Sequence, residues 1–301
     1  MISLEPTALI GSYTPLITPF AGDDIDLATF ERLVDRQVTG GSQGVVVAGT
    51  TGEPSMLLPR ERTELVRAAV SAAGGRIPVV AATGSASYAE TRSLSEAAVA
   101  AGANALLIVT PYYLRPPQRG LVEYFADLGS RVDVPVLIYH IPGRSAVTVD
   151  IGTLEAIADR TPNVTGMKHA SWELGLVTEA RIRLGPEFRI FVGLEELSLP
   201  MLALGAHGLM NAVANLVPGR IAALWRAVAE ERLADARKLH DDLWELNRAV
   251  FLDTNPIPVK YMMRRIGILA SNDHRLPMMP ATPELEERLD GVLERAQLTG
   301  G

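Results

Sequence analysis

The sequence contains no cysteine among its 301 residues. This absence excludes disulfide bonds, thiolate zinc sites, iron–sulfur clusters and a cysteine nucleophile. It fits the reducing conditions of the cytoplasm, which is where we expect the protein to work.

The chain also lacks a basic surplus and any long apolar run. Lys and Arg number 28 against 35 Asp and Glu, which gives a net charge of −7, so we expect no nucleic-acid partner. No apolar run approaches the roughly 18 residues that a membrane span requires. The first residues show no basic segment followed by an apolar one, as a signal peptide would. We therefore expect no membrane partner and no signal peptide. Apolar residues still make up 48% of the chain, which is enough for a large core.

Eight short apolar runs, rich in β-branched residues, recur along the first 230 residues. Near-continuous apolar runs are typical of parallel strands that are buried on both faces. The predicted strands are Leu9–Thr14, Gly44–Ala48, Pro78–Ala81, Ala105–Thr110, Val136–Tyr139, Val164–Lys168, Arg189–Gly193 and Gly208–Asn211.

Amphipathic segments of helical length separate these runs. Asp26 is predicted to cap the first of them, and Gly40 ends it. Eight strand–helix units predict an α/β fold, a (β/α)₈ TIM barrel, over residues 1–230. Residues 231–301 are predicted to form a C-terminal extension of three helices packed on the barrel. The predicted barrel helices are Asp26–Gly40, Pro59–Ala73, Ser87–Ala101, Gln118–Arg131, Ile151–Asp159, Ser171–Leu184, Glu195–Leu204 and Pro218–Glu230, and those of the extension are Arg232–Val250, Ile257–Ile266 and Pro283–Gln297.

Lys168 is the sharpest single candidate for catalysis. A barrel of this kind carries its active site at the carboxyl ends of its strands, and Lys168 ends the sixth predicted strand. Partial desolvation at the barrel mouth favours the neutral, nucleophilic amine, which forms a Schiff base with a keto substrate. The alternative is a lysine whose amine extends to solvent.

Two other strand ends carry polar residues that suit an active site. The hydroxyls and backbone N–H groups around Thr50 and Thr51 could hold a carboxylate, although an ordinary turn satisfies such hydroxyls locally. Tyr139 could relay protons through its phenol, or it could pack in the core with its hydroxyl in water. Arg144 could pair with a second carboxylate or lie at the surface.

The five histidines do not predict a metal site. His140 and His169 end neighbouring predicted strands, whereas His207, His240 and His274 are scattered. The GxGxxG dinucleotide fingerprint is absent as well. We therefore expect no metal and no cofactor.

Taken together, six motifs resemble those of the dihydrodipicolinate synthase and N-acetylneuraminate lyase family. The resemblance covers roughly residues 5–297, and it is more specific for the family than for one substrate within it. The motifs are Gly49-Thr50-Thr51-Gly52-Glu53, Thr110-Pro111-Tyr112-Tyr113, Tyr139-His140-Ile141-Pro142-Gly143-Arg144, Gly166-Met167-Lys168, Asn255-Pro256-Ile257-Pro258-Val259-Lys260 and Arg275-Leu276-Pro277-Met278.

The resemblance implies a role for each candidate residue in a class I aldolase or lyase. Lys168 would form the Schiff base with pyruvate, and Tyr139 would relay protons with Thr50 and Tyr113 as partners. Tyr113 typically reaches the site of a neighbouring subunit, so a homodimer or homotetramer is implied. The implied substrate-binding residues are Thr51, Arg144, Gly193 and Met210.

The partner of pyruvate remains open. The Thr-Thr pair at 50–51 and the motif at 142–144 favour the synthase branch, which uses aspartate semialdehyde. His140, His169 and Leu194 stand where that branch usually has an Asn, a Glu and an acidic residue. Succinate semialdehyde, or a sugar acid in an aldolase or dehydratase, is therefore an alternative. An alternative of another class is a non-catalytic barrel that binds 2-oxo acids.

The positions of His140 and His169 also carry a geometric expectation. Side chains alternate along a strand, and adjacent strands lie about 4.8 Å apart. If Tyr139 and Lys168 face the barrel mouth, the two imidazoles meet behind them, and at least one is neutral near pH 7.

A second family site bears on regulation. Many synthases of the family bind lysine as an inhibitor in a cleft at the dimer interface. Tyr112 and Glu90 match residues of that site, whereas Ala86, Pro59 and Arg62 stand where an Asn and two His are usual. An ammonium group would lose most of its acceptors there and would meet Arg62. We therefore predict no inhibition by lysine.

Overall fold

The computed structural model of the protein describes Glu5 and residues 8–298. The outer bounds of the predicted domains, residues 1 and 301, lie outside the described residues. Most of the N-terminal segment in which we predicted no signal peptide also lies outside the described residues.

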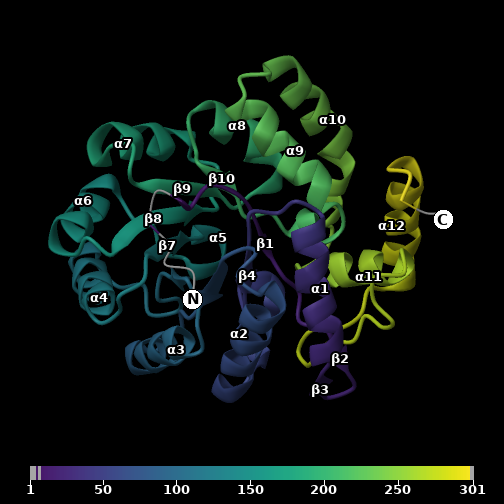
Figure 1. Ribbon diagram of the computed structural model, residues 1–301, viewed down its shortest axis with the longest axis horizontal. Coiled ribbons are helices and arrows are strands. Elements are labelled where there is room, and N and C mark those ends of the chain that lie inside the picture. The colour runs from purple at the N-terminus through teal and green to yellow at the C-terminus, as the bar shows by residue number, and fades with distance from the viewer. Residues whose placement is uncertain (1–4, 6–7, 299–301) are drawn as a thin grey trace.

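The eight predicted strands form a closed parallel barrel (Figure 1). Neighbours in the barrel are neighbours in the chain, and β1 closes the ring by pairing with both β10 and β4. This arrangement confirms the predicted fold class. The strands are β1 (Gly11–Pro15), β4 (Gly44–Val47), β5 (Val79–Ala82), β6 (Ala105–Val109), β7 (Val136–His140), β8 (Val164–His169), β9 (Arg189–Val192) and β10 (Gly208–Leu209).

A helix follows each strand and lies on the outside of the barrel (Figure 1). Polar side chains cap several of these helices as the sequence suggests: Asp26 accepts a hydrogen bond from the Thr29 backbone at the start of α1. Ser87 caps α3 in the same way. The helices are α1 (Leu27–Thr39), α2 (Pro59–Ala73), α3 (Tyr88–Ala100), α4 (Gln118–Ser130), α6 (Ile151–Arg160), α7 (Leu174–Leu184), α8 (Ser198–Ala203) and α9 (Pro218–Ala229).

Both faces of the strands are buried, which explains their continuous apolar runs. Along β4, Val45 and Val47 belong to the core between the strands and the helices. Val46 belongs instead to a smaller cluster inside the barrel, which also contains Tyr139 and Met210. Because side chains alternate along a strand, this inner cluster identifies the residues that point towards the barrel axis.

The C-terminal extension consists of α10 (Leu233–Ala249), α11 (Ile257–Arg265) and α12 (Pro283–Arg295). Helix α10 packs on α9, and α12 packs against α10 and α11; in Figure 1 these helices lie on one side of the barrel, near α1 and α9. Buried side chains of α11 and α12 join the outer core of the barrel. The three predicted helices are confirmed, and the division at residue 230 stays a prediction.

Several short elements have no counterpart in the sequence analysis. Strands β2 (Phe20–Ala21) and β3 (Asp24–Ile25) form a small antiparallel ribbon, and α5 (Pro142–Ser145) is a single turn. Elements of two to four residues are too short to show a hydrophobic period.

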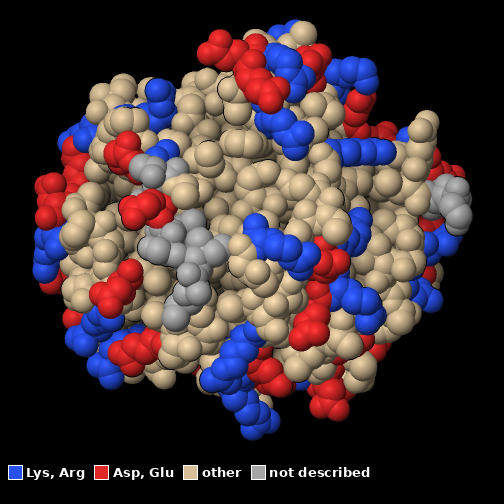
Figure 2. Space-filling model, in the orientation of Figure 1, with Lys and Arg blue, Asp and Glu red and all other residues tan. Residues whose placement is uncertain are grey.

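The surface and the helices add two observations. On the face shown in Figure 2, basic and acidic side chains are interspersed around the edge. No helix within the described ranges is long and apolar enough to cross a membrane.

Candidate active site

Lys168 and Tyr139 lie side by side at the carboxyl ends of β8 and β7. The two residues are register partners, and the Lys168 Nζ lies 4.4 Å from the centre of the Tyr139 ring. Each side chain is only 5% exposed. Within the described residues no carboxylate lies within ion-pair distance of Lys168. The structure therefore brings a buried amine without an ion-pair partner against a phenol, as a Schiff-base site requires.

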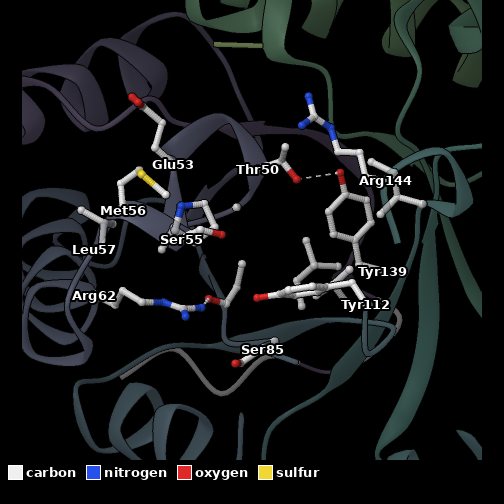
Figure 3. Close-up of a pocket in the computed structure, with 18 of the residues that line it drawn as sticks. Thr50, Glu53, Ser55, Met56, Leu57, Arg62, Ser85, Tyr112, Tyr139 and Arg144 are labelled. Atoms are coloured by element: carbon white, nitrogen blue, oxygen red, sulfur yellow. Dashed lines mark hydrogen bonds between the residues drawn. The ribbon is translucent and has the colours of Figure 1, made fainter. Parts of the chain in front are cut away.

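Thr50 connects this pair to the loop that follows β4. Thr50 begins a short 3₁₀ turn, η2 (Thr50–Gly52). Its hydroxyl lies 3.2 Å from the Tyr139 hydroxyl (Figure 3). Either oxygen is able to donate, so the contact suits a proton relay between the two residues.

Thr51, the next residue, is buried and already has one partner. The side-chain amide of Asn255 donates a hydrogen bond of 2.9 Å to the Thr51 hydroxyl oxygen. The hydroxyl hydrogen is thereby directed elsewhere, since the oxygen acts as the acceptor in this bond. The Thr51 hydroxyl hydrogen is thus available to another acceptor.

A cavity of about 430 Å³ opens beside Thr50 and Tyr139, whereas Lys168 and Thr51 are not among the residues that line it. Loops after β4, β5, β6 and β7 line it, together with Asn255 and Met278 from the extension. Thr50, Tyr139 and Arg144 all line it (Figure 3). Arg144 comes from α5 and is exposed at the rim, where a guanidinium is free to pair with a carboxylate. The volume suits two small molecules.

Gly193 and Met210 are the two remaining predicted substrate-binding residues. A Cβ atom on Gly193 would lie 2.8 Å from the Lys168 Cε and 2.8 Å from the Ala170 Cβ. Only glycine leaves room for the Lys168 side chain at this position. Met210 is fully buried inside the barrel with Tyr139 and Phe191, and its backbone N–H donates to Val192. It packs beneath the candidate site.

Tyr113 is the one predicted catalytic residue that the structure leaves outside the site. It is 91% exposed, and its backbone has a left-handed φ of 73°. Its neighbour Tyr112 lines the cavity instead. Within one chain, Tyr113 therefore does not meet Thr50 or Tyr139.

His140 and His169 meet behind Tyr139 and Lys168, as their positions predicted. Both are fully buried, and their Nδ1 atoms lie 3.0 Å apart. The His169 Nε2 donates to the Glu173 carbonyl, so in a neutral ring its Nδ1 is bare and accepts from the His140 Nδ1–H. Burial lowers the pKa of His140 to about 4, and the neighbouring His169 adds to the shift. Burial also lowers the pKa of His169, so both rings are neutral near pH 7.

Three buried residues near the loop have no role in the sequence analysis. The Glu53 carboxylate accepts hydrogen bonds from the Lys260 Nζ at 2.8 Å and from the His274 Nδ1 at 3.0 Å. Lys260 belongs to a helix of the extension, but its side chain reaches the loop after β4. No local pattern announces a contact between residues 207 positions apart.

Glu195 is a second buried acid that the sequence analysis overlooked. Its Oε1 accepts from the Ala212 backbone N–H, whereas its Oε2 has no partner within the described residues. Burial raises the pKa of Glu195 to about 7, and the positive charge of Lys168 acts in the opposite direction. Among the described residues no group of three or more His, Asp or Glu side chains converges as a metal site would require.

Comparisons with known proteins agree closely on one family. The model of the dihydrodipicolinate synthetase family matches residues 8–296. A 4-hydroxy-tetrahydrodipicolinate synthase from Thermus thermophilus is 42% identical over 286 residues, which is 95% of each chain. The solved dihydrodipicolinate synthase from Aquifex aeolicus superimposes with a TM-score of 0.94 at 36% identity, over 96% of this chain and 99% of that one. A solved monomeric dihydrodipicolinate synthase variant gives a TM-score of 0.94 at 32% identity, over 97% and 98%.

Proposed function

Because the chain belongs to the dihydrodipicolinate synthetase family of pyruvate-dependent class I aldolases, we propose that it condenses pyruvate with aspartate semialdehyde on Lys168. The observation that carries the proposal is the register pairing of Lys168 with Tyr139, with Thr50 at 3.2 Å from the Tyr139 hydroxyl. A nucleophilic amine and a proton relay lie together at the mouth of the barrel.

The reaction begins at the Lys168 amine. The nitrogen attacks the ketone carbon of pyruvate, and the carbonyl oxygen leaves as water. The resulting iminium withdraws electrons, so the methyl group loses a proton and becomes the nucleophilic carbon of an enamine. That carbon attacks the aldehyde carbon, whose oxygen takes up a proton. Hydrolysis of the second iminium frees the product and restores the amine.

Tyr139 moves the protons in this sequence. Its ring lies against the Lys168 Nζ and its hydroxyl lies beside Thr50, so a proton is able to pass between the phenol and the threonine hydroxyl. The buried position keeps bulk water away from the relay. Removal of the phenol oxygen is therefore expected to slow the chemistry rather than the binding of pyruvate.

Two sets of donors hold the two carboxylates. Thr51, oriented by Asn255, and the free N–H groups at the start of the turn are placed for the pyruvate carboxylate. Arg144 at the rim of the cavity is placed for the carboxylate of the semialdehyde.

Borohydride trapping tests the Schiff base directly. Incubation with pyruvate and borohydride should add a reduced pyruvyl group to Lys168, and peptide mass analysis should locate it there. Omission of pyruvate and the variant Lys168→Ala are the controls. Modification of Lys238 or Lys260 with an unmodified Lys168 would refute the assignment, and no adduct at all would favour a non-catalytic barrel.

An aldehyde panel tests the second substrate. Succinate semialdehyde, which lacks the amino group, is the second candidate because His140, His169 and Leu194 replace residues usual in the synthases. Neither histidine lines the cavity, however, and their Nδ1 atoms are hydrogen-bonded to each other. We therefore expect aspartate semialdehyde to be preferred in kcat/KM by tenfold or more, about 1.4 kcal/mol. A preference for succinate semialdehyde would overturn this choice of substrate.

We also propose that Tyr113 completes the site of a neighbouring copy of the chain. Its exposure and its position beside the cavity-lining Tyr112 support this role. Light scattering should then give a dimer or tetramer, and Tyr113→Ala should lower kcat without changing the assembly. A fully active monomer would contradict the proposal; the solved monomeric relative makes the measurement necessary.

A further inference from the structure

Left-handed backbone at a non-glycine residue ends the turn that carries Thr50 and Thr51. Glu53 closes the turn with φ 55° and ψ 46°, a conformation that is unfavourable for a residue with a Cβ. Such a residue keeps this conformation only where the surroundings determine it. We therefore expect the contacts of the Glu53 side chain to hold the loop after β4 in its conformation.

Those contacts come from the C-terminal extension. Lys260 and His274 supply both donors to the buried Glu53 carboxylate. Lys260 also donates to the Asp273 carbonyl at 2.6 Å and lies 4.4 Å from the centre of the Phe20 ring. Lys260 is 0% exposed. Burial lowers its pKa, and the Glu53 carboxylate opposes this shift.

The extension contacts the same turn a second time. Asn255, just before α11, donates to the Thr51 hydroxyl and is itself nearly fully buried. Asn255 lies just before α11 and Lys260 lies within it, and they bind two residues of the same turn, Thr51 and Glu53. Glu53 is the residue with the left-handed backbone.

We propose that Asn255 and Lys260 are positioning residues for pyruvate: they hold the loop after β4 so that the Thr51 hydroxyl donates to the pyruvate carboxylate. The inference rests on the proposed function. Neither residue touches the reacting carbon, so their loss should weaken pyruvate binding and leave the chemistry on Lys168 largely intact. The barrel thereby depends on its extension for substrate binding as well as for packing.

Steady-state kinetics of Lys260→Met and Asn255→Asp test this inference. An aspartate side chain accepts only, so it turns the Thr51 hydrogen towards itself and places a negative charge near the substrate carboxylate. Each variant should raise KM for pyruvate by about tenfold or more, as expected when a hydrogen bond to a charged group is lost. KM for the aldehyde and kcat should stay within about threefold.

Lys238→Met is the matched control, because Lys238 is an exposed lysine that pairs with Asp242 on α10. It should leave every kinetic constant unchanged. In addition, Glu53→Gln combined with Lys260→Met should be no worse for pyruvate than the more affected single variant, because both act through one pair. If the effects of the two substitutions on KM for pyruvate multiplied in the double variant, Glu53 and Lys260 would not act through one pair.

The outcomes separate cleanly. A folded Lys260→Met with KM for pyruvate within about twofold of the parent overturns the role of Lys260. If that variant does not fold, Asn255→Asp decides: a raised KM supports the inference, and an unchanged KM refutes it. Borohydride trapping on the parent is done first. If the parent does not trap pyruvate, the proposed function fails; if it traps pyruvate but the variants keep their affinity, only this inference fails.

Discussion

The mouth of the barrel and its junction with the extension each bury one lysine, but in the part of the chain that the structure describes only one of the two lysines has an ion-pair partner. At the mouth, Lys168 lies against the Tyr139 ring, and no carboxylate within the described residues forms an ion pair with it. At the junction, Lys260 is held by Glu53, the Asp273 carbonyl and the Phe20 ring. An amine without a partner is free to react, whereas a fully partnered amine holds structure. Burial alone thus does not distinguish the two lysines; the presence of an ion-pair partner does.

The largest expected effect concerns Lys168. Lys168→Ala should lower kcat/KM by more than about a thousandfold, because no other group supplies the Schiff-base nitrogen. Lys238→Ala should leave kcat/KM unchanged. If the Lys168 variant turned over at the parent rate, Lys168 would not be the reactive lysine.

Lys260 should show the converse, a loss of stability. Lys260→Met leaves the buried Glu53 charge without its main partner, which is expected to lower the free energy of unfolding by about 3–5 kcal/mol. Urea unfolding of this variant beside Lys238→Met measures the difference. Equal unfolding midpoints for the two variants would show that the buried pair adds no stability.

The next prediction concerns Tyr139, whose ring lies against the Lys168 amine. Tyr139→Phe keeps the ring over Lys168 and removes the hydroxyl that contacts Thr50. We expect kcat to fall by about a hundredfold, a typical effect of losing a positioned proton-transfer group, while borohydride still traps pyruvate on Lys168. Loss of trapping together with loss of turnover would mean that the hydroxyl is needed to form the Schiff base, and not only for the later proton transfers.

His140 is a further buried basic residue, and within the described residues its side-chain partner is His169 rather than an acid. In the unfolded chain His140 takes up a proton near its ordinary pKa of 6.5, whereas in the folded protein it stays neutral down to about 4. The unfolded state binds more protons in this window, so stability falls as the pH is lowered through it, by up to about 1.4 kcal/mol per pH unit. His140→Asn should flatten this dependence.

Free energies of unfolding at pH 6.5 and at about pH 5 measure the effect in parent and variant. The raised pKa of Glu195 acts with the opposite sign, since that group stabilises the fold as the pH drops below about 7. It is present in both proteins and cancels in the difference. Parallel pH profiles would contradict the assignment to His140.

The smallest expected effect is that of added lysine. Arg62 is buried at the cavity wall, where it donates to the Ala82 carbonyl and lies with Ser85 and Tyr112 (Figure 3). This fixed cation would repel the ammonium groups of lysine. Initial rates should therefore be the same with and without millimolar lysine. A saturable inhibition curve would show that Glu90 and other acceptors outweigh Arg62.

The sequence by itself determined the barrel and the two residues, Lys168 and Tyr139, that lie together at its mouth. Strand and helix periods are local, so the eight strands and the three helices of the extension could be read from residue order. Lys168 and Tyr139 could be paired because both end neighbouring parallel strands, and the alternation of side chains then placed His140 against His169.

Only the tertiary structure decided which residues, distant in the chain, hold the loops around Lys168 and Tyr139. Glu53 meets Lys260 across 207 residues, and Asn255 meets Thr51 across 204. Tyr113 points into solvent although its motif suggested catalysis. Such contacts depend on how α11 and the preceding segment pack on the loop after β4. Packing between distant segments is a property of the assembled core, and no period or spacing in the chain encodes the position of one side-chain atom against another.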